Sequence, residues 1–252
     1  MCGIGGWFGV RIPKKLIRKA FLELQDRGRD ATGIAFLKEN GDFGVYKAPI
    51  PASSFVFNSY YSRILREASQ SKVVLLHCRA ATNGSPQNNK NNHPIWNNQG
   101  IIVHNGIVSP VSSKKKPRGD TDTEKLMLAI QERGFEALRR TGGSYAFCYI
   151  DKIKRKGWLI RRWAPLYAGR IGDGFVFGST RQIVRILAST MWIMELEEEL
   201  LYETDFKGTL REKEKIEYEF DERRYYVRVR GFEPYKEGNS PYIWDNYPYM
   251  LE

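Results

Sequence analysis

The sequence predicts an α+β domain in which groups of strands alternate with helices in packed layers. Two patterns carry this prediction: short apolar runs of strand length, and longer segments with an apolar residue at every third or fourth position. The chain has 252 residues, enough for one large domain or two small ones. Its 42% hydrophobic and 27% charged residues are typical of a globular chain and exclude an intrinsically disordered one.

The N-terminal part of the chain contains a strand, a helix and a hairpin. Residues 2–10 are apolar and rich in glycine, which favours a buried strand that other backbone approaches closely. Pro13 favours the start of a helix, and Gly28 is suited to the left-handed conformation at its end. The dipeptide Asn40-Gly41 favours a primed turn, so it predicts a hairpin formed by residues 34–38 and 43–48.

Helices and strands continue to alternate along the rest of the chain. We expect helices over residues 53–69, 121–139 and 179–188, the second of which begins with a capping box at residues 121–124. We expect strands in the apolar runs at residues 73–79, 100–104, 143–151, 157–162 and 174–178. Residues 83–99 are rich in Asn, Gly and Pro and predict either an ordered loop or a flexible lid.

The composition changes near residue 220. Residues 221–252 contain many aromatic side chains among Pro, Gly and charged residues. We interpret residues 1–220 as the domain and residues 221–252 as a C-terminal extension that packs on the domain or on a partner.

The chain is strongly basic, with a net charge of +11 and a pI near 9.5. This charge favours contact with an anionic partner, and nucleic acid is one such partner. The chain has no known nucleic-acid-binding motif, so we prefer a solvated basic surface. The densest basic stretch, residues 114–118, is expected to be an exposed loop before a helix.

Targeting segments and metal-binding motifs are missing from the sequence. No apolar run approaches the ~20 residues of a membrane span, and the N-terminus lacks the features of a secretory signal, so we expect a cytoplasmic protein. Cys78 and Cys148 lie in apolar runs and are expected to be buried, inert thiols. Adjacent residues of a strand point to opposite faces, so His77 and Cys78 do not predict a zinc site. We expect no metal and no cofactor.

Cys2 is a candidate nucleophile. Met1 is removed when the following side chain is small, and cysteine meets this condition. The new N-terminus would carry a thiol together with an α-amine that titrates near pH ~7.7–8.0 and can act as a general base. Taken alone this pattern is weak, since a Met-Cys start also occurs by chance and the Gly-rich segment reads equally well as a plain strand.

Ordered motifs along the chain strengthen this hypothesis. They are Met1-Cys2-Gly3-Ile4-Gly5-Gly6, Arg27-Gly28-Arg29-Asp30-Ala31-Thr32-Gly33, His77-Cys78-Arg79-Ala80-Ala81-Thr82-Asn83-Gly84, Asn92-His93-Pro94, His104-Asn105-Gly106-Ile107-Val108 and Asp120-Thr121-Asp122-Thr123-Glu124. In this order and over residues 2 to about 215, the sequence resembles the class II glutamine amidotransferases, whose glutaminases use an N-terminal nucleophile. The resemblance implies a four-layer αββα sandwich of the N-terminal-nucleophile hydrolase type.

The resemblance also implies a catalytic set. Cys2 would attack the side-chain amide carbon of glutamine and form a γ-glutamyl thioester, which water cleaves to glutamate after ammonia has left. The Asn105 side-chain NH₂ and the Gly106 backbone N–H would form the oxyanion hole. Asn105-Gly106 is also compatible with a simple tight turn after a strand.

The same comparison implies residues that bind and support the substrate. Arg79 would pair with the α-carboxylate of glutamine, and Asp122 would accept hydrogen bonds from its α-ammonium group. An acid in the first helical turn also stabilises the helix by itself, and the two roles are compatible for Asp122. Thr82 would contact the substrate. Supporting roles are implied for Arg27, which would orient Cys2, and for Gly28 and His104.

The chain departs from the family pattern at three places. Ala80 stands where Trp is usual and Asn83 where His is common, which affects the segment that closes over glutamine. The segment between Gly106 and Asp122 is shorter than in the synthases and Lys-rich. No synthase domain follows, so we expect the ammonia acceptor site either on a separate partner protein or built from the aromatic residues of the C-terminal extension.

Two other functions stay open at this stage. The first is hydrolysis of another γ-glutamyl or amide substrate on the same fold. The second is a non-catalytic basic protein with this fold, used for binding or assembly.

Overall fold

The computed structural model describes residues 1–189 and 192–219, so the predicted extension 221–252 lies outside the described residues. Within these residues the backbone forms two antiparallel sheets. The first has the strand order β11-β9-β10-β1-β4-β2-β3 and the second β13-β12-β8-β7-β6-β5. The first sheet contains β1 (Gly3–Phe8), β2 (Ala31–Leu37), β3 (Phe43–Ala48), β4 (Val73–Arg79), β9 (Tyr167–Ile171), β10 (Gly174–Gly178) and β11 (Ile193–Glu195). The second contains β5 (Ile95–Trp96), β6 (Gly100–Gly106), β7 (Tyr145–Asp151), β8 (Lys156–Arg162), β12 (Leu200–Asp205) and β13 (Leu210–Lys215).

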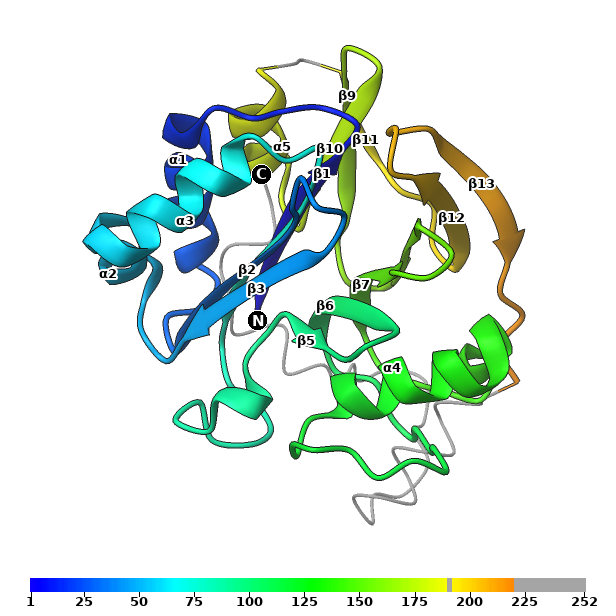
Figure 1. Ribbon diagram of the computed structural model, residues 1–252. Coiled ribbons are helices and arrows are strands. Elements are labelled where there is room, and N and C mark those ends of the chain that lie inside the picture. Colours follow the sequence, from blue (N-terminus) through cyan, green and yellow to red (C-terminus); the bar gives the residue numbers. More distant parts are fainter. Residues whose placement is uncertain (190–191, 220–252) are drawn as a thin grey trace, which may run out of the picture. The chain divides into compact units, whose positions relative to one another are not determined.

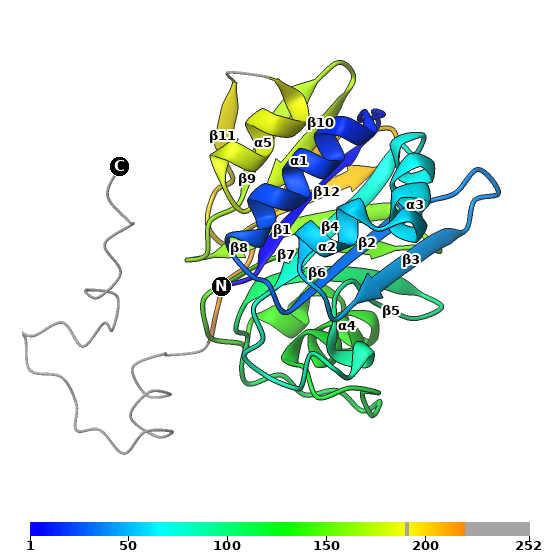
Figure 2. The same cartoon turned by 90° about the vertical axis from the view of Figure 1, so that its left-hand side faces the viewer.

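Helices cover the outer face of each sheet. The helices on the first sheet are α1 (Lys14–Gln25), α2 (Ala52–Phe57), α3 (Ser59–Ser69) and α5 (Arg181–Ala188), as Figure 2 shows. The second sheet is covered by α4 (Asp122–Arg133) and the 3₁₀ helix η2 (Gly134–Leu138) (Figure 1). This αββα arrangement confirms the predicted four-layer fold.

Three apolar clusters lie at the three boundaries between the layers. Strand β4 shows how one run serves two of them, since successive side chains of a strand point to opposite faces. Val74 and Leu76 pack under the helices, whereas Val73 and Leu75 pack between the sheets. A strand buried on both faces must be apolar at every position, which is why these segments read as continuous apolar runs.

Some predicted element ends differ from the structure. The helix expected over 53–69 is interrupted at Asn58, whose extended backbone and side-chain oxygen begin α3 as an N-cap. The helix expected over 121–139 ends at Arg133, because Gly134 has a φ of +65°. Strands β5, β9, β11, β12 and β13 were not predicted, and β5 lies within residues 83–99, which were expected to form a loop or lid. β13 is a charged, exposed edge strand without the apolar run that identifies buried strands.

Two local conformations were predicted wrongly. Gly28 does not have a positive φ; it follows the end of α1 and must be glycine for space, since a Cβ there would lie 2.3 Å from the Arg79 carbonyl carbon. The β2–β3 hairpin forms as expected, but only Gly41 of the Asn40-Gly41 pair has a positive φ, so the turn is not of the primed type.

None of the helices in the described part of the chain is long and apolar enough to cross a membrane.

Candidate active site

The ends of several elements place the residues expected to carry the chemistry. Cys2 directly precedes β1, and Gly3, the first residue of β1, pairs with Cys78 of β4. Cys2 therefore lies beside Arg79, the last residue of β4. Asn105 and Gly106 are the last residues of β6. The ends of β4 and β6 are adjacent across the two sheets, since His77 Nε2 lies 3.1 Å from the His104 carbonyl oxygen.

The Cys2 thiol is half-buried and lies next to backbone and cationic groups. Its Sγ is 3.4 Å from the Ala80 carbonyl oxygen. Arg27 Nε donates a hydrogen bond of 3.1 Å to the Cys2 carbonyl oxygen, so the guanidinium contacts the backbone of Cys2. Burial raises the pKa of the thiol, and the positive charges of the N-terminal amine and Arg79 oppose that rise. The thiol therefore requires a neighbouring base to form a thiolate near neutral pH.

Asn105 has the features of a preorganised hydrogen-bond donor. Its side chain is 0% exposed, and neither Nδ2 nor Oδ1 has a hydrogen-bond partner among the described residues. A buried carboxamide without partners costs free energy, so such a group is a candidate for binding a ligand or a transient charge. Gly106 follows with a φ of +112°, and a Cβ there would lie 2.1 Å from the Ser144 carbonyl oxygen. The turn after β6 therefore requires glycine.

Arg79 is almost fully buried and already hydrogen-bonded. Its side chain donates to Asn92 Oδ1 at 2.9 Å, to the Gly84 carbonyl oxygen at 2.8 Å and to the Asn83 carbonyl oxygen. These acceptors hold the guanidinium against residues 83–92, at 2% exposure of the residue. Thr82 is exposed beside it. Both Nη2 N–H groups and one Nη1 N–H group of Arg79 are thus used by residues 83–92, which leaves the Nε N–H and the second Nη1 N–H as donors.

Asp122 begins α4 and faces the segment after Gly106. Its Oδ2 accepts a hydrogen bond of 3.0 Å from the Val108 N–H, and its Oδ1 accepts one of 2.8 Å from the Thr123 N–H. Its negative charge adds to the effect of burial in raising the pKa of Cys2. The carboxylate therefore stabilises the local backbone and remains half-exposed near the thiol.

Gly28 and Asp30 connect the end of α1 to the backbone around Arg79. Asp30 Oδ2 accepts a 2.7 Å hydrogen bond from the Ala81 N–H, and the Asp30 N–H donates to the Arg79 carbonyl oxygen at 2.9 Å. Sequence reasoning did not select Asp30 as a site residue, although it lies in a quoted motif with Gly28. The position of Asp30 within that motif, two residues after Gly28, is the sequence feature that could have identified it.

Three buried histidines form a cluster beside these residues. The His77 and His93 rings stack with centroids 4.2 Å apart, and the His104 ring lies 6.4 Å from His93. His104 Nδ1 is 2.8 Å from Thr123 Oγ1, but His77 Nδ1, His104 Nε2 and both ring nitrogens of His93 have no partner among the described residues. Burial lowers the pKa of all three, that of His77 to about 3, so the imidazoles are neutral near pH 7.

Lys47 of β3 lies beside the histidine cluster. Its Nζ donates to the carbonyl oxygens of Asn92 at 2.5 Å and of Pro94 at 3.2 Å. Burial lowers the pKa of Lys47 to about 8. In residues 1–189 and 192–219, no group of three or more His, Cys, Asp or Glu side chains could hold a metal ion.

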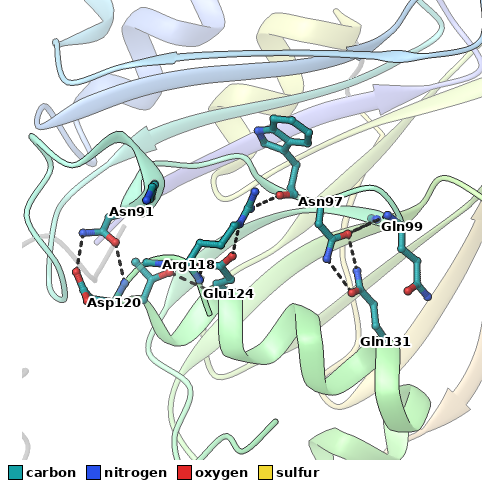
Figure 3. A network of polar contacts seen from close by, with 12 residues as sticks. Asn91, Asn97, Gln99, Arg118, Asp120, Glu124 and Gln131 are labelled. Carbon is teal, nitrogen blue, oxygen red and sulfur yellow. Dashed lines mark hydrogen bonds and ion pairs between the residues drawn. The ribbon is translucent and has the colours of Figure 1, made fainter. Parts of the chain in front are cut away.

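A polar network connects the loop after β4 with the N-terminus of α4 (Figure 3). It contains Asn91, Asn97, Gln99, Arg118, Asp120, Glu124 and Gln131. Glu124 is buried and accepts hydrogen bonds from the Arg118 and Gly119 N–H groups at 3.0 and 2.8 Å. Its partner in the expected capping box, Thr121, accepts from the Glu124 N–H at 3.4 Å, so Glu124 serves the preceding turn instead of the Thr121 backbone.

Sequence comparison places the chain among known proteins. The model of the family "Glutamine amidotransferases class-II" matches residues 20–151, just over half of the chain. The glutamine–fructose-6-phosphate aminotransferase of Geobacillus kaustophilus is 27% identical over 231 residues, covering 84% of this chain and 37% of that protein. The enzyme of the same name from Gluconobacter oxydans is 31% identical over 217 residues, covering 77% of this chain and 34% of that protein. The chain thus spans about a third of the length of these relatives.

Solved structures show the same fold. The glutamine phosphoribosylpyrophosphate amidotransferase from B. subtilis superposes with a TM-score of 0.65 at 20% identity, covering 84% of this chain and 49% of that one. An allosteric regulatory enzyme of purine biosynthesis gives a TM-score of 0.67 at 20% identity, covering 84% and 48%. Together with the match to the family model, these likenesses identify the chain as a member of the class II glutamine amidotransferases.

Proposed function

We propose that this chain hydrolyses the side-chain amide of glutamine through a thioester on Cys2 and releases ammonia for an acceptor on a partner protein. The observation that carries the proposal is the buried Asn105 carboxamide without a partner, at the end of β6 and next to Gly106. A preorganised donor of this kind is suited to stabilise negative charge that develops only in the transition state.

The proposed reaction begins after Met1 has been removed. The α-amine of Cys2 accepts the thiol proton, and the thiolate attacks the amide carbon of glutamine. Negative charge on the tetrahedral intermediate is stabilised by Asn105 Nδ2 and the Gly106 N–H. The ammonium group then gives its proton to the departing ammonia, and water cleaves the remaining thioester to glutamate. Because burial raises the pKa of the thiol, a base on the same residue has a clear role.

Charges of both signs influence Cys2 and support a substrate with both an α-carboxylate and an α-ammonium group. Arg79 provides the cation and Asp122 the anion, and both act on the thiol pKa. Both N–H groups of Arg79 Nη2 are used by the carbonyl oxygens of Asn83 and Gly84, so bidentate binding of a carboxylate, which needs Nη2 together with Nε or Nη1, requires one of these hydrogen bonds to be exchanged. Exposed Thr82 directly precedes the segment that would make this exchange.

The destination of the ammonia is the second half of the proposal. The relatives are roughly three times as long as the matched region, and their names describe transfer of an amino group from glutamine to fructose 6-phosphate. We infer that residues 1–220 form the glutaminase and that the acceptor site belongs to a partner protein.

The test is a glutaminase assay on the full chain combined with labelling of its cysteines. We expect glutamate release that is lost in Cys2→Ala, an intact mass that lacks Met1, and modification by 6-diazo-5-oxo-norleucine at Cys2 alone. Cys78 and Cys148 are the internal controls, since both are buried and burial raises the pKa of each thiol. Active protein that retains Met1, or glutamate release unchanged in Cys2→Ala, would contradict the mechanism. Turnover of another γ-glutamyl amide but not of glutamine would support the alternative substrate class.

A further inference from the structure

Asn91 occupies a distinctive place in the loop after β4. It belongs to an Asn-rich run in which Asn88 and Asn89 are exposed, whereas the Asn91 side chain is 0% exposed. Its Nδ2 donates to the Ser85 carbonyl oxygen at 3.2 Å and to Asp120 Oδ2 at 3.3 Å. Its Oδ1 accepts a hydrogen bond of 2.9 Å from the Asp120 N–H, so both ends of the carboxamide are used (Figure 3).

The space around Asn91 is closed by two glycines from different segments. A Cβ at Gly84 would lie 2.5 Å from Asn91 Nδ2, and a Cβ at Gly119 would lie 2.5 Å from Asn91 Oδ1. Both backbones therefore pack directly on the carboxamide, and neither position accepts a side chain without displacing Asn91. The two glycine backbones therefore restrict movement of the Asn91 carboxamide, in addition to its hydrogen bonds.

Each of the two segments belongs to a different end of the proposed glutamine site. Gly84 and Asn92 hold the Arg79 guanidinium through the Gly84 carbonyl oxygen and Asn92 Oδ1. Asp120, on the other segment, is two residues before Asp122. The backbone of that second segment is in turn held on α4 by the Glu124 carboxylate.

We propose that Asn91 is a positioning residue that sets the spacing between Arg79 and Asp122. The inference rests on the proposed glutamine site and names a determinant of its affinity. Asn91 touches neither substrate nor the reacting thiol; it ties the segment that holds the carboxylate-binding arginine to the segment that carries the ammonium-binding aspartate. Its effect falls on recognition of the two charged ends of an α-amino acid and not on the acyl-transfer steps.

Steady-state kinetics of the full chain test this role. Asn91→Ala removes three hydrogen bonds, and we expect substrate binding to lose the equivalent of one of them, which corresponds to about a tenfold change in an equilibrium constant. We therefore expect Asn91→Ala to raise the KM for glutamine about tenfold while kcat changes by less than about twofold. Asn91→Asp keeps the shape and the acceptor but places a carboxylate against Asp120, so an equal or larger rise in KM is expected near pH 7.5.

The matched control is Asn97→Ala. Asn97 forms a reciprocal amide pair with Gln131, with distances of 2.9 and 3.1 Å, and so ties the β5–β6 turn to the last turn of α4. Like Asn91, Asn97 links two segments through its side-chain carboxamide. The segments that Asn97 links are not those of Arg79 and Asp122. We expect its KM to match the wild type. If KM rises as much in Asn97→Ala as in Asn91→Ala, the positioning role is overturned. A fall in kcat with unchanged KM in Asn91→Ala would also overturn it.

Two further measurements separate this inference from the proposed function. In the double variant Asn91→Ala/Asp120→Ala, KM should be no higher than in Asn91→Ala, because both changes break the same tie. Hydrogen exchange should show that residues 83–92 and 118–122 lose protection together in Asn91→Ala and not in Asn97→Ala. Absence of glutamine turnover in the wild type would reject the proposed function, whereas unchanged exchange in Asn91→Ala would reject the tie whatever the activity.

Discussion

The histidine cluster makes the stability of this protein sensitive to mild acid. The chain has three histidines, and all of them lie in the cluster of His77, His93 and His104. Their pKa values are lowered by burial, so the folded state keeps them neutral where the unfolded chain binds protons. The positive charges of Lys47 and Arg79 add to this effect at His77 and His93, while Asp122 opposes it at His104.

The sign and size follow from proton linkage. An unfolded histidine titrates near pH ~6.5, so the unfolded state binds more protons below that pH and the free energy of unfolding falls as pH falls. Each histidine that stays neutral in the folded state lowers the free energy of unfolding by about 2 kcal/mol between pH 7 and pH 5. His77 meets this condition, since its pKa in the folded state is about 3. His93, whose pKa is lowered well below its usual value, meets it too, so these two residues give about 4 kcal/mol, a large part of the stability of a typical domain. His104 acts in the same direction.

The assay is urea unfolding of the full chain at pH values from 7 to 5, followed by circular dichroism. Carboxylates titrate near pH ~4 when unperturbed and the α-amine near pH ~8, so histidines dominate this window. His93→Leu is the matched variant, because neither ring nitrogen of His93 has a partner to lose. The slope of unfolding free energy against pH between 6 and 5 should fall by about 1.2 kcal/mol per pH unit in this variant, the contribution of one histidine that stays neutral in the folded state. An unfolding free energy that is the same at pH 7 and pH 5 would refute the reasoning.

Three further predictions concern single residues. Asn105→Ala should lower kcat for glutamine about 10²–10³-fold with no loss of unfolding free energy, because its carboxamide has no partner; a stability loss equal to that of a hydrogen-bonded amide would contradict this. Gly33→Ala should lower the unfolding free energy by more than about 2 kcal/mol, since a Cβ there would lie 2.0 Å from the His93 carbonyl oxygen; Gly41→Ala, with nothing within 4 Å, is the control and should cost about 1 kcal/mol for its positive φ. Glu124→Ala should destabilise by about 2–3 kcal/mol in thermal or urea unfolding, because it removes the shared acceptor of the turn before α4; an effect within experimental error would show that water replaces it.

The layered fold and the identity of the family could be predicted from sequence for a physical reason. Strands buried on both faces are apolar throughout, and ordered motifs mark the ends of β1, β4 and β6 where polar groups are tolerated. Edge strands escape this rule. β13 contains Arg211, Glu212 and Lys213 in an exposed run, and its pairing with β12 depends on a sheet edge that no local pattern reveals.

The details of the site depended on packing that sequence patterns do not encode. Gly28 is compatible with a helix cap and with a close approach to Arg79, and only the tertiary fold selects the second. The Asn-rich run is similarly ambiguous. Asn88 and Asn91 have the same propensities, and the difference between an exposed cap and a buried tie arises from Gly84 and Gly119 meeting around one of them.

The unpartnered amide at position 105 also bears on how this protein could change over generations. A small apolar side chain at this position would leave no unsatisfied side-chain polar atoms in the interior. Mutation toward better folding therefore runs against the amide, and only selection on chemistry retains it. In a lineage where the chain no longer acted on glutamine, position 105 would be among the first to drift, before the glycines that the fold itself requires.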